Sequence, residues 1–491
     1  MNSLLCETVT AGTTADLIAA RDAAMAGGLV ELRLDGVADL DVARALHGRR
    51  APVIATCRPV WEGGRFDGSE ERRAAILERA LALGAEYVDI EWRAVRGLHG
   101  EAYKRILGGN PSRIVLSSHD FDGVPSDLQQ RAREMRGSGA AVIKLAVTPS
   151  RLSDTLPLID IARDGNAVVI GMGDAGVPTR LLAARYGSKW TYAGNAAAPG
   201  QIPAERMLSE FRFRQVGRET RLFGVISTNA LHSVSPAMHN AAFEAVGLDA
   251  AYVPLRAADF DDFLAFAAAL DVEGASVTIP FKRDALRAAS SVDDLTRRVG
   301  AANTVRRRAT EWHATNTDVA GFLAPLEHAF GGPLEGARAF VAGAGGSARA
   351  VVAALLSKGA HVSVHARRVE QAREVADSLG AAVGAWPVPA GADILVNCTP
   401  LGGAGLRDQT PIEPEALQGA FVYDLTYGPG DSRLLADARA AGCRVLDGLP
   451  MLVAQAERQF EWWTGHRPPR DVMRDAAYAK VGRQRPVEVS R

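Results

Sequence analysis

The sequence predicts an α/β protein in which an N-terminal (β/α)8 barrel is followed by a two-lobed second half, with an α/β lobe and a Rossmann-like lobe. Three observations predict this fold. Short apolar runs alternate with helix-like segments over the first ~210 residues, which is the pattern of a barrel. A glycine-rich turn between a predicted strand and helix begins at Gly343, as is typical of a Rossmann-like lobe. At 491 residues, the chain is too long for a single hydrophobic core.

The barrel prediction depends on apolar runs of strand length bounded by turn residues. The predicted strands cover residues 4–9, 29–34, 53–56, 87–90, 114–116, 142–146, 168–170 and 191–193. Helix-like segments lie between them, among them 70–83, 127–136 and 152–162. A doubly wound open sheet is the alternative, but the glycine-rich turn expected after its first strand is missing.

Unusual polar residues lie on these strands at or near their predicted carboxyl ends, where a barrel binds its ligands. They are Glu31, Arg33, Arg58, Glu91, His119 and Lys144. We expect their side chains to converge, provided that the strand assignments hold.

Lys144 is the most specific of these candidates because it interrupts the apolar run 142–146. Desolvation disfavours its charged form and makes the neutral amine available as a nucleophile. A structural ion pair with Glu31 or Glu91 is the alternative. His119, one strand earlier, is a candidate general acid or base, or else a hydrogen-bonded structural histidine. Glu91 is the candidate to orient and charge-balance His119; the alternative is that Glu91 pairs with an arginine.

Several motifs of the first half, taken together and in order, resemble the type I 3-dehydroquinate dehydratases from Leu4 to about Arg214. These motifs are Glu31 to Asp35, Thr56-Cys57-Arg58 with Glu62-Gly63-Gly64, Tyr87 to Glu91, Ser117 to Phe121, Ile143 to Ala146, Met172-Gly173 through Arg180, and Ala198-Pro199-Gly200-Gln201. Two positions depart from the family pattern, since Ala197 and Thr179 stand where serine is common.

The resemblance implies that Lys144 forms an imine with a substrate ketone and that His119 removes a proton from the adjacent carbon. The imine is the electron sink, so this half requires no metal or organic cofactor. Arg180 would clamp the substrate carboxylate, because a planar guanidinium matches a planar anion. The residues that would bind hydroxyls or shape the pocket are Glu31, Arg33, Arg58 and Gln201.

The second half contains the pattern G-x-G-x-x-A between a predicted strand and a helix that lasts to about Leu356. Such glycines permit a tight turn and bring backbone close to a pyrophosphate at the helix N-terminus. An ordinary strand–helix turn is the alternative. The next predicted strand, 361–364, is followed by Arg367 and Arg368 instead of an acidic residue. A guanidinium there suits a 2′-phosphate, so NADP is favoured over NAD.

An α/β segment from about Leu222 to Phe322 precedes this loop. Ser235 before Pro236 is a good helix N-cap, although Ser233 and Ser235 could instead meet a carboxylate. Considered one at a time, Lys282 is expected to be a solvated surface lysine and Asp318 a helix cap.

In order, the motifs of this half resemble shikimate dehydrogenase from about Phe223 to Gly465. They are His232 to Pro236 with His239-Asn240, Val277 to Lys282, Gly300 to Val305, Asn316 to Asp318, the glycine loop, Asn397 to Gly402, Asp424 to Tyr427 with Pro429, and Gly448 to Met451 with Gln455-Ala456. Three positions depart from the family pattern. Val234 stands where lysine is common, and Gly403 and the Ala366-Arg367-Arg368 segment also differ from the pattern.

This second resemblance implies a catalytic pair, Lys282 and Asp318, in which the lysine protonates the ketone oxygen. The implied substrate-binding residues are Ser233, Ser235, Thr278, Asn303, Asp318, Tyr427 and Gln455. The implied cofactor-binding residues are Gly343, Ala344, Gly345, Gly346, Ser347, Ala348, Arg367, Arg368, Thr399, Gly448 and Met451.

Composition argues against several classes of partner. The formal net charge of −1 gives no electrostatic case for nucleic acid or an anionic membrane. No apolar run reaches the ~18 residues of a membrane-spanning helix, and no signal or transit peptide is visible, so we expect a cytoplasmic location. The four cysteines form no C-x-x-C pair, and we expect reduced thiols and no metal site.

We therefore expect a fused enzyme, with a dehydratase over residues 1–216 and a dehydrogenase over 217–491, acting as a monomer or homodimer. The substrate lobe of the dehydrogenase would comprise about 217–322 plus 447–480, and its NADP lobe about 323–446. The alternatives are a quinate-preferring dehydrogenase half that uses NAD(P), a non-catalytic sensor of quinate or shikimate, and an unrelated Schiff-base aldolase.

Overall fold

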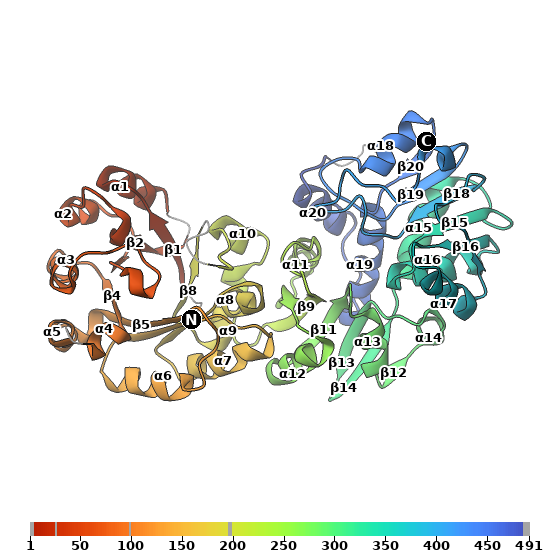
Figure 1. The fold of residues 1–491 in the computed structure, drawn as a ribbon. Coiled ribbons are helices and arrows are strands. Elements are labelled where there is room, and N and C mark those ends of the chain that lie inside the picture. Colours follow the sequence, from red (N-terminus) through yellow and green to blue (C-terminus); the bar gives the residue numbers. More distant parts are fainter. Residues whose placement is uncertain (1–3, 25–26, 98–99, 195–198, 485–491) are drawn as a thin grey trace. The chain divides into compact units, whose positions relative to one another are not determined.

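The computed structural model describes residues 4–24, 27–97, 100–194 and 199–484. The chain forms two compact units (Figure 1). The first comprises residues 1–221, 229–231 and 253–270, and the second comprises 222–228, 232–252 and 271–491. Each unit is described by itself.

The first unit contains an eight-stranded sheet in the order β7-β6-β5-β4-β3-β2-β1-β8. Its strands are β1 (Leu4–Thr10), β2 (Gly28–Arg33), β3 (Val53–Thr56), β4 (Tyr87–Glu91), β5 (Ile114–Asp120), β6 (Val142–Val147), β7 (Ala167–Gly171) and β8 (Trp190–Ala193). The strand pairings described in this sheet are all parallel, including that of β1 with β8. The backbone N–H of Lys189 donates to the carbonyl of Ala167 at 2.9 Å, which brings β8 to β7 and nearly closes the barrel. The predicted barrel is confirmed, and the open sheet is wrong for this half.

Helices surround these strands (Figure 1). They are α1 (Thr14–Ala23), α2 (Val42–Leu46), α3 (Glu70–Ala82), α4 (Trp92–Arg96), α5 (Gly100–Gly109), α6 (Leu128–Gly137), α7 (Leu156–Arg163), α8 (Val177–Leu181), α9 (Ala183–Tyr186) and α10 (Ala204–Ser209). Helix α3 begins where predicted because Ser69 caps it, its hydroxyl accepting from the N–H of Arg72. The segment predicted as one helix over 152–162 is a 3-10 turn, Ser153–Thr155, followed by α7.

The barrel interior changes from apolar to polar along the strands. Side chains alternate between the two faces of a strand, so every second residue enters the interior. One buried cluster includes Cys6, Leu29, Ile54, Val115, Val142, Val168 and Trp190. The polar residues at or near the carboxyl ends follow in the same alternation, for example Lys144 two residues after Val142.

The second unit begins with a mixed sheet in the order β10-β9-β11-β13-β14-β12. Its strands are β9 (Arg221–Ser227), β10 (Ala250–Arg256), β11 (Val272–Val277), β12 (Ser291–Val292), β13 (Thr304–Arg308) and β14 (Glu311–Thr315). The accompanying helices are α11 (Ser235–Ala245), α12 (Phe260–Leu270), α13 (Lys282–Ala288), α14 (Asp294–Val299), α15 (Asp318–Phe330), α19 (Leu449–Thr464) and α20 (Val472–Lys480). Residues 253–270, which include the end of β10 and all of α12, are assigned to the first compact unit.

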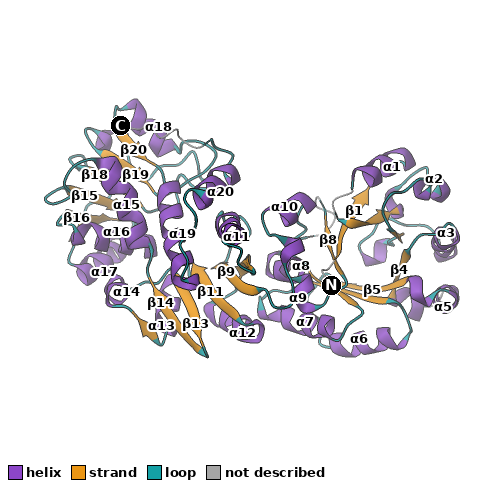
Figure 2. Cartoon of the chain, turned by 180° about the vertical axis from the view of Figure 1, so that it is seen from behind, coloured by secondary structure: helices purple, strands orange, loops and turns teal. Residues whose placement is uncertain are grey.

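The third sheet has the order β17-β16-β15-β18-β19-β20, and all of its pairings are parallel. Its strands are β15 (Arg338–Ala342), β16 (His361–His365), β17 (Ala382–Val383), β18 (Ile394–Asn397), β19 (Phe421–Asp424) and β20 (Arg444–Leu446). Helices α16 (Gly346–Ser357), α17 (Val369–Leu379) and α18 (Arg433–Ala440) connect them (Figure 2). This arrangement confirms the predicted Rossmann-like lobe. Within the described residues, no helix combines the length and apolar character needed to cross a membrane.

Candidate active sites

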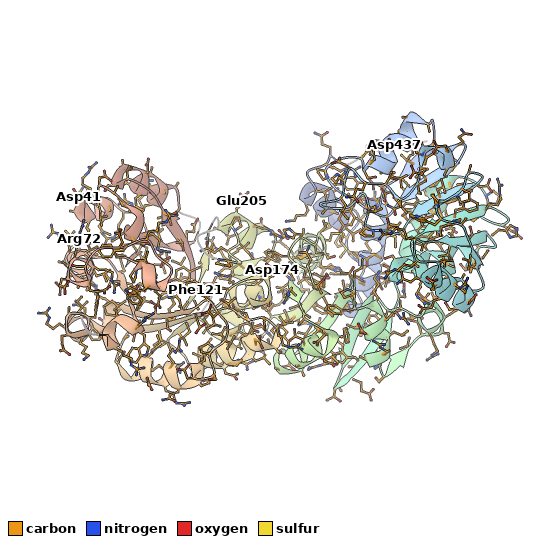
Figure 3. All side chains as sticks on the ribbon, viewed as in Figure 1. Asp41, Arg72, Phe121, Asp174, Glu205 and Asp437 are labelled. Carbon is orange, nitrogen blue, oxygen red and sulfur yellow. The ribbon has the colours of Figure 1, made fainter. Side chains whose placement is uncertain are left out.

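A cavity of about 350 Å³ opens in the barrel. It brings together most of the residues predicted for this half, which come from six different strands and the loops beyond them. Its lining includes Glu31, Arg33, Arg58, Glu62, His119, Phe121, Lys144, Arg180, Tyr192 and Gln201. Phe121, labelled in Figure 3, follows β5 and stacks beside His119, with their ring centroids 6.3 Å apart.

The amine of Lys144 is buried among side chains from β2, β4 and β8. Its Nζ lies 3.2 Å from Oδ2 of Asp89, 3.5 Å from Oε1 of Glu31 and 4.3 Å from the ring centroid of Tyr192. Barrel side chains form layers contributed by alternate strands, and this set is such a layer. The alternative of an ion pair with Glu31 is confirmed. The one considered with Glu91 is wrong, because Asp89 is the β4 carboxylate level with the amine.

His119 is oriented by Glu62, from the loop after β3. Oε1 of Glu62 lies 3.2 Å from Nδ1 of His119 and accepts the backbone N–H of His119 at 3.0 Å. Burial, together with the charges of Arg58 and Lys144, holds the pKa of His119 well below its usual range. Burial also raises the pKa of Glu62 to about 7. A neutral imidazole anchored through one nitrogen leaves the other nitrogen available as a base.

The role expected for Glu91 is corrected by its contacts. Its carboxylate accepts from Nη1 of Arg58 at 2.7 Å and from Nη1 of Arg73. The alternative prediction, an arginine partner, is therefore confirmed, and Glu62 takes the place beside His119. Sequence reasoning assigned Glu62 no role, although it stands in the noted Glu62-Gly63-Gly64 motif. The signal was its position in a loop after a barrel strand, since such loops build the site.

Arg180, on α8, is a buried cation without a carboxylate partner among the described residues. Its side chain is 1% exposed and donates only to two carbonyls, those of Tyr192 and Pro199, each at 3.3 Å. Its Nε has no hydrogen-bond partner within the described chain. Burial lowers the pKa of this guanidinium to about 10. An uncompensated buried cation facing a cavity is suited to an anionic ligand.

Ala197, one of the two departures from the dehydratase family pattern, lies outside the described residues.

A second cavity, of about 290 Å³, lies within the second unit. All the substrate-binding and catalytic residues predicted for the dehydrogenase half line it, together with four of the predicted cofactor-binding residues. Its lining includes Ser233, Ser235, Thr278, Lys282, Asn303, Asp318, Ser347, Thr399, Tyr427, Gly448, Met451 and Gln455.

Lys282 and Asp318 form a buried pair in this cavity. Nζ of Lys282 lies 2.6 Å from Oδ2 of Asp318 and 3.1 Å from Oγ of Ser347. Lys282 is 7% exposed, so the surface-lysine reading is wrong. The cap reading of Asp318 is also wrong, because Oδ1 of Asn316 accepts the N–H groups of Asp318 and Val319 at the start of α15.

A web of amides and hydroxyls fixes the Asp318 carboxylate. Nδ2 of Asn303 donates to Oδ1 of Asp318 at 2.7 Å and to Oε1 of Gln455 at 3.3 Å. Ser276 and Gln459 extend this web: the Ser276 hydroxyl donates to Oε1 of Gln459 at 2.6 Å. Both line the cavity and both were missed. Their signal is weak, because β11 and α19 are far apart in sequence and meet only in the fold.

Ser233 and Ser235 lie at the start of α11, but Ser235 is not the N-cap residue that the sequence predicted. Val234 occupies the N-cap position and Ser235 is the first helical residue, with Pro236 in the first turn. The expected Ser235 cap is therefore wrong. The Ser233 hydroxyl accepts the N–H of Ser235 at 3.2 Å, and both side chains line the cavity.

The glycine loop leaves the N-terminus of α16 without a side-chain cap, Gly345 being the N-cap residue. Gly343 has φ +117°, a conformation that favours glycine. A Cβ on Gly346 would meet Cδ of Lys282 at 2.8 Å. Beyond β16, Arg367 and Arg368 are exposed. The uncapped N–H groups and these guanidinium groups fit the phosphates of a dinucleotide.

Comparison with known proteins agrees with this division. Residues 5–218 match the family model of type I 3-dehydroquinase, residues 225–305 the shikimate dehydrogenase substrate binding domain, and residues 448–478 the shikimate 5'-dehydrogenase C-terminal domain. The chain is 31% identical over 506 residues to the Arabidopsis thaliana bifunctional 3-dehydroquinate dehydratase/shikimate dehydrogenase, chloroplastic, covering 96% of this chain and 83% of the relative. It belongs to this bifunctional dehydratase/dehydrogenase family.

Two further relatives cover only the dehydrogenase half of this bifunctional chain. The shikimate dehydrogenase (NADP(+)) of Oleidesulfovibrio alaskensis is 41% identical, over 51% of this chain and 91% of its own. The crystal structure of a shikimate dehydrogenase in complex with NADP+ has a TM-score of 0.51 at 31% identity, covering 54% of this chain and 96% of the other. The bifunctional family joins a lyase and an oxidoreductase.

Proposed function

We propose that residues 1–216 dehydrate 3-dehydroquinate to 3-dehydroshikimate and that residues 217–491 reduce this ketone to shikimate with NADPH. The substrate lobe of the second part would comprise about 217–322 plus 447–480, and the NADP lobe about 323–446. The observation that carries the proposal is the content of the barrel cavity, where the buried amine of Lys144 and the unpaired guanidinium of Arg180 line one space. A ligand with a ketone and a carboxylate fits both.

In the barrel, Nζ of Lys144 attacks the ketone carbon, and the carbonyl oxygen leaves as water. The resulting iminium withdraws electrons and acidifies the adjacent C–H bond. His119 takes that proton, oriented by Glu62, and returns it to the departing hydroxyl group so that a second water leaves. Hydrolysis of the imine then frees the product. We propose that this elimination is syn and that Glu31, Arg33, Arg58 and Gln201 hold the substrate, while Glu91 fixes Arg58.

In the second cavity, the hydroxyls of Ser233 and Ser235 would bind the same carboxylate. Thr278, Asn303, Tyr427 and Gln455 would bind or border the ring hydroxyls. Negative charge develops on the ketone oxygen during reduction, and the ammonium of Lys282 stabilises and protonates it. Asp318 holds the Lys282 amine in place through its 2.6 Å contact.

The glycine loop fits NADP in three ways: close backbone approach, an uncapped helix N-terminus and two exposed arginines after β16. When bound, NADPH supplies the hydride. Arg367 and Arg368 would face the 2′-phosphate, and Met451 with Gly448 would border the nicotinamide. The residues that would cradle the phosphates or border the cofactor are Gly343, Ala344, Gly345, Gly346, Ser347, Ala348 and Thr399.

A second candidate is a dehydrogenase half that prefers quinate, which steady-state rates with shikimate and quinate would distinguish, each measured with both cofactors. A non-catalytic sensor is disfavoured because both lysines are buried beside carboxylates, Lys144 beside Asp89 and Lys282 beside Asp318. The proposal includes a cytoplasmic location, supported by the free cysteines Cys6, Cys57, Cys398 and Cys443. It also includes a monomeric or homodimeric state, which light scattering would test.

The test of the proposed function separates the two half-reactions. Wild-type protein incubated with dehydroquinate and NADPH is expected to form shikimate. Lys144→Ala should lose dehydration but still reduce supplied dehydroshikimate, whereas Lys282→Ala should accumulate dehydroshikimate. Borohydride added with dehydroquinate should label Lys144.

Two exposed lysines provide matched controls for these variants. Lys104, 56% exposed on α5, pairs with Glu101, and Lys358, 43% exposed after α16, pairs with Glu327. Their alanine variants should retain both activities. Loss of both half-reactions in a folded Lys144→Ala or Lys282→Ala protein would contradict the two-site proposal.

A further inference from the structure

The ring of Tyr192 covers the amine of Lys144. Nζ lies 4.3 Å from the ring centroid, within the range of a cation–π contact. The remaining contacts of this amine are with two carboxylates, those of Asp89 and Glu31. Among these three neighbours of Nζ, the aromatic ring is the uncharged one.

The position of Tyr192 is fixed by its surroundings. It lies on β8, is 4% exposed and lines the barrel cavity. Its backbone carbonyl accepts from Nη1 of Arg180 at 3.3 Å. One residue therefore meets the amine through its ring and the proposed carboxylate clamp through its backbone. Its hydroxyl is buried and lies beside the indole of Trp190, so the ring face is the part of the side chain that meets Lys144.

We propose that the face of Tyr192 stabilises the positive charge on Nζ of Lys144 throughout imine formation. This inference rests on the proposed dehydratase function and adds a residue to it. The neutral amine and the ketone, with one proton taken up, give an iminium and one water. The positive charge then sits on the same nitrogen and is delocalised toward the former ketone carbon.

The ring suits this task better than a third carboxylate would. A nearby anion stabilises the iminium but also favours the unreactive ammonium form of the free lysine by direct charge attraction. A π face attracts a cation more weakly, and its effect grows in a desolvated site. The ring thus stabilises the charged intermediate with a smaller cost to the reactivity of the free amine.

The test compares Tyr192→Phe with Tyr192→Leu, using Tyr87→Leu as the matched control. Tyr87 is another aromatic residue of the barrel, with its ring packed against Trp190 at 5.5 Å between centroids. Measured quantities are kcat and KM for dehydroquinate and the rate of borohydride trapping at Lys144. Reduction of supplied dehydroshikimate by the same chain provides the internal measure of intact protein.

Tyr192→Phe is expected to stay within about 3-fold of wild type, because the ring face remains. Tyr192→Leu is expected to lose about 10- to 30-fold in kcat and in trapping rate, with KM within about 3-fold. Tyr87→Leu should leave both largely intact. If Tyr192→Leu does not fold, phenylalanine at this position with increasing ring fluorination keeps the shape while weakening the π face, and kcat should fall stepwise.

Three results would overturn the inference. One is a Tyr192→Leu protein with wild-type kcat, or a fluorinated series with constant kcat. Another is a loss in Tyr192→Phe as large as in Tyr192→Leu, which would assign the role to the hydroxyl. The third is a rise in KM alone, which would indicate support of Arg180. Absence of trapped imine in wild-type protein would instead overturn the proposed dehydratase function, on which the inference depends.

Discussion

Oε1 of Glu62 lies 3.2 Å from Nδ1 of His119 and also accepts the backbone N–H of that histidine. Both contacts come from one carboxylate in the loop after β3, so the position and the ring orientation of His119 depend on the same group. Burial raises the pKa of Glu62 to about 7 and holds the pKa of His119 well below its usual range. The pair therefore changes charge near neutral pH through the carboxyl.

This relationship predicts the pH dependence of dehydration. His119 is already neutral at pH 6 because its pKa is depressed, so the ionisation that remains is that of Glu62. Ionised Glu62 accepts from Nδ1–H and keeps the other nitrogen basic, so activity should rise as pH increases through about 7. Glu62→Gln should lower kcat by about 10- to 100-fold and remove this rise. Measuring kcat from pH 5 to 9 checks both.

The control for Glu62→Gln is Glu78→Gln on the exposed face of α3, which should keep the wild-type profile. A Glu62→Gln protein that retains the same rise near pH 7 would assign that ionisation to another group.

Replacing Arg180 should weaken substrate binding but stabilise the ligand-free fold. Burial lowers the pKa of Arg180 from the ordinary range of a guanidinium to about 10, which corresponds to roughly 3 kcal/mol. At neutral pH this cation is better solvated in the unfolded chain, so its burial opposes folding. Arg180→Met should raise the free energy of unfolding of the ligand-free protein by about 1–2 kcal/mol while raising KM for dehydroquinate by about 100-fold or more.

Denaturant unfolding and steady-state kinetics on the same Arg180→Met protein check this prediction. Arg72→Met, at the exposed position labelled in Figure 3, is the matched control and should change neither quantity by much. Destabilisation of Arg180→Met would show that its two carbonyl contacts outweigh the burial of its charge.

Most of the fold was predictable because its strands are short apolar runs between turn residues. Lys144 illustrates why the site was partly predictable: a charged residue within an apolar strand is a strong local signal. Its neighbours Asp89 and Tyr192 were not assigned, because contact between β4, β6 and β8 depends on the layers of a closed barrel. Period-two alternation puts Asp89 and Glu91 on one face of a strand, but it does not say which of them is level with the amine.

Loop residues and capping residues were predicted less well. Glu62 contacts His119, which lies 57 positions later in the sequence, so its place in a loop after a barrel strand indicated a site residue but not its partner. Ser235 matches the residue preference of an N-cap, yet the helix begins one residue earlier than that preference implies. Local propensity is a weak guide where a cavity recruits the hydroxyl instead.

Ser347 connects the glycine loop to the lysine of the second cavity. Its hydroxyl oxygen accepts from Nζ of Lys282 at 3.1 Å. Ser347→Ala should lower kcat for dehydroshikimate reduction by about 3- to 10-fold, because one of the contacts that orient the ammonium is lost. KM for dehydroshikimate should change little. Ser357→Ala, at the other end of α16, is the matched control.

A rise in KM for NADPH with unchanged kcat would contradict this positioning role for Ser347. It would indicate instead that the hydroxyl binds the cofactor, as the resemblance implied.

Arg367 should determine the choice between NADPH and NADH. It follows β16, where a dinucleotide-binding lobe meets the adenine ribose, and it is exposed. A guanidinium recognises a 2′-phosphate through charge-assisted hydrogen bonds, and NADH lacks that phosphate. Arg367→Ala should therefore raise KM for NADPH by about 10- to 100-fold and leave KM for NADH nearly unchanged. Arg373→Ala, exposed on α17, should alter neither. Equal losses with both cofactors would mean that Arg367 supports the lobe or stacks on the adenine, and that the preference arises elsewhere.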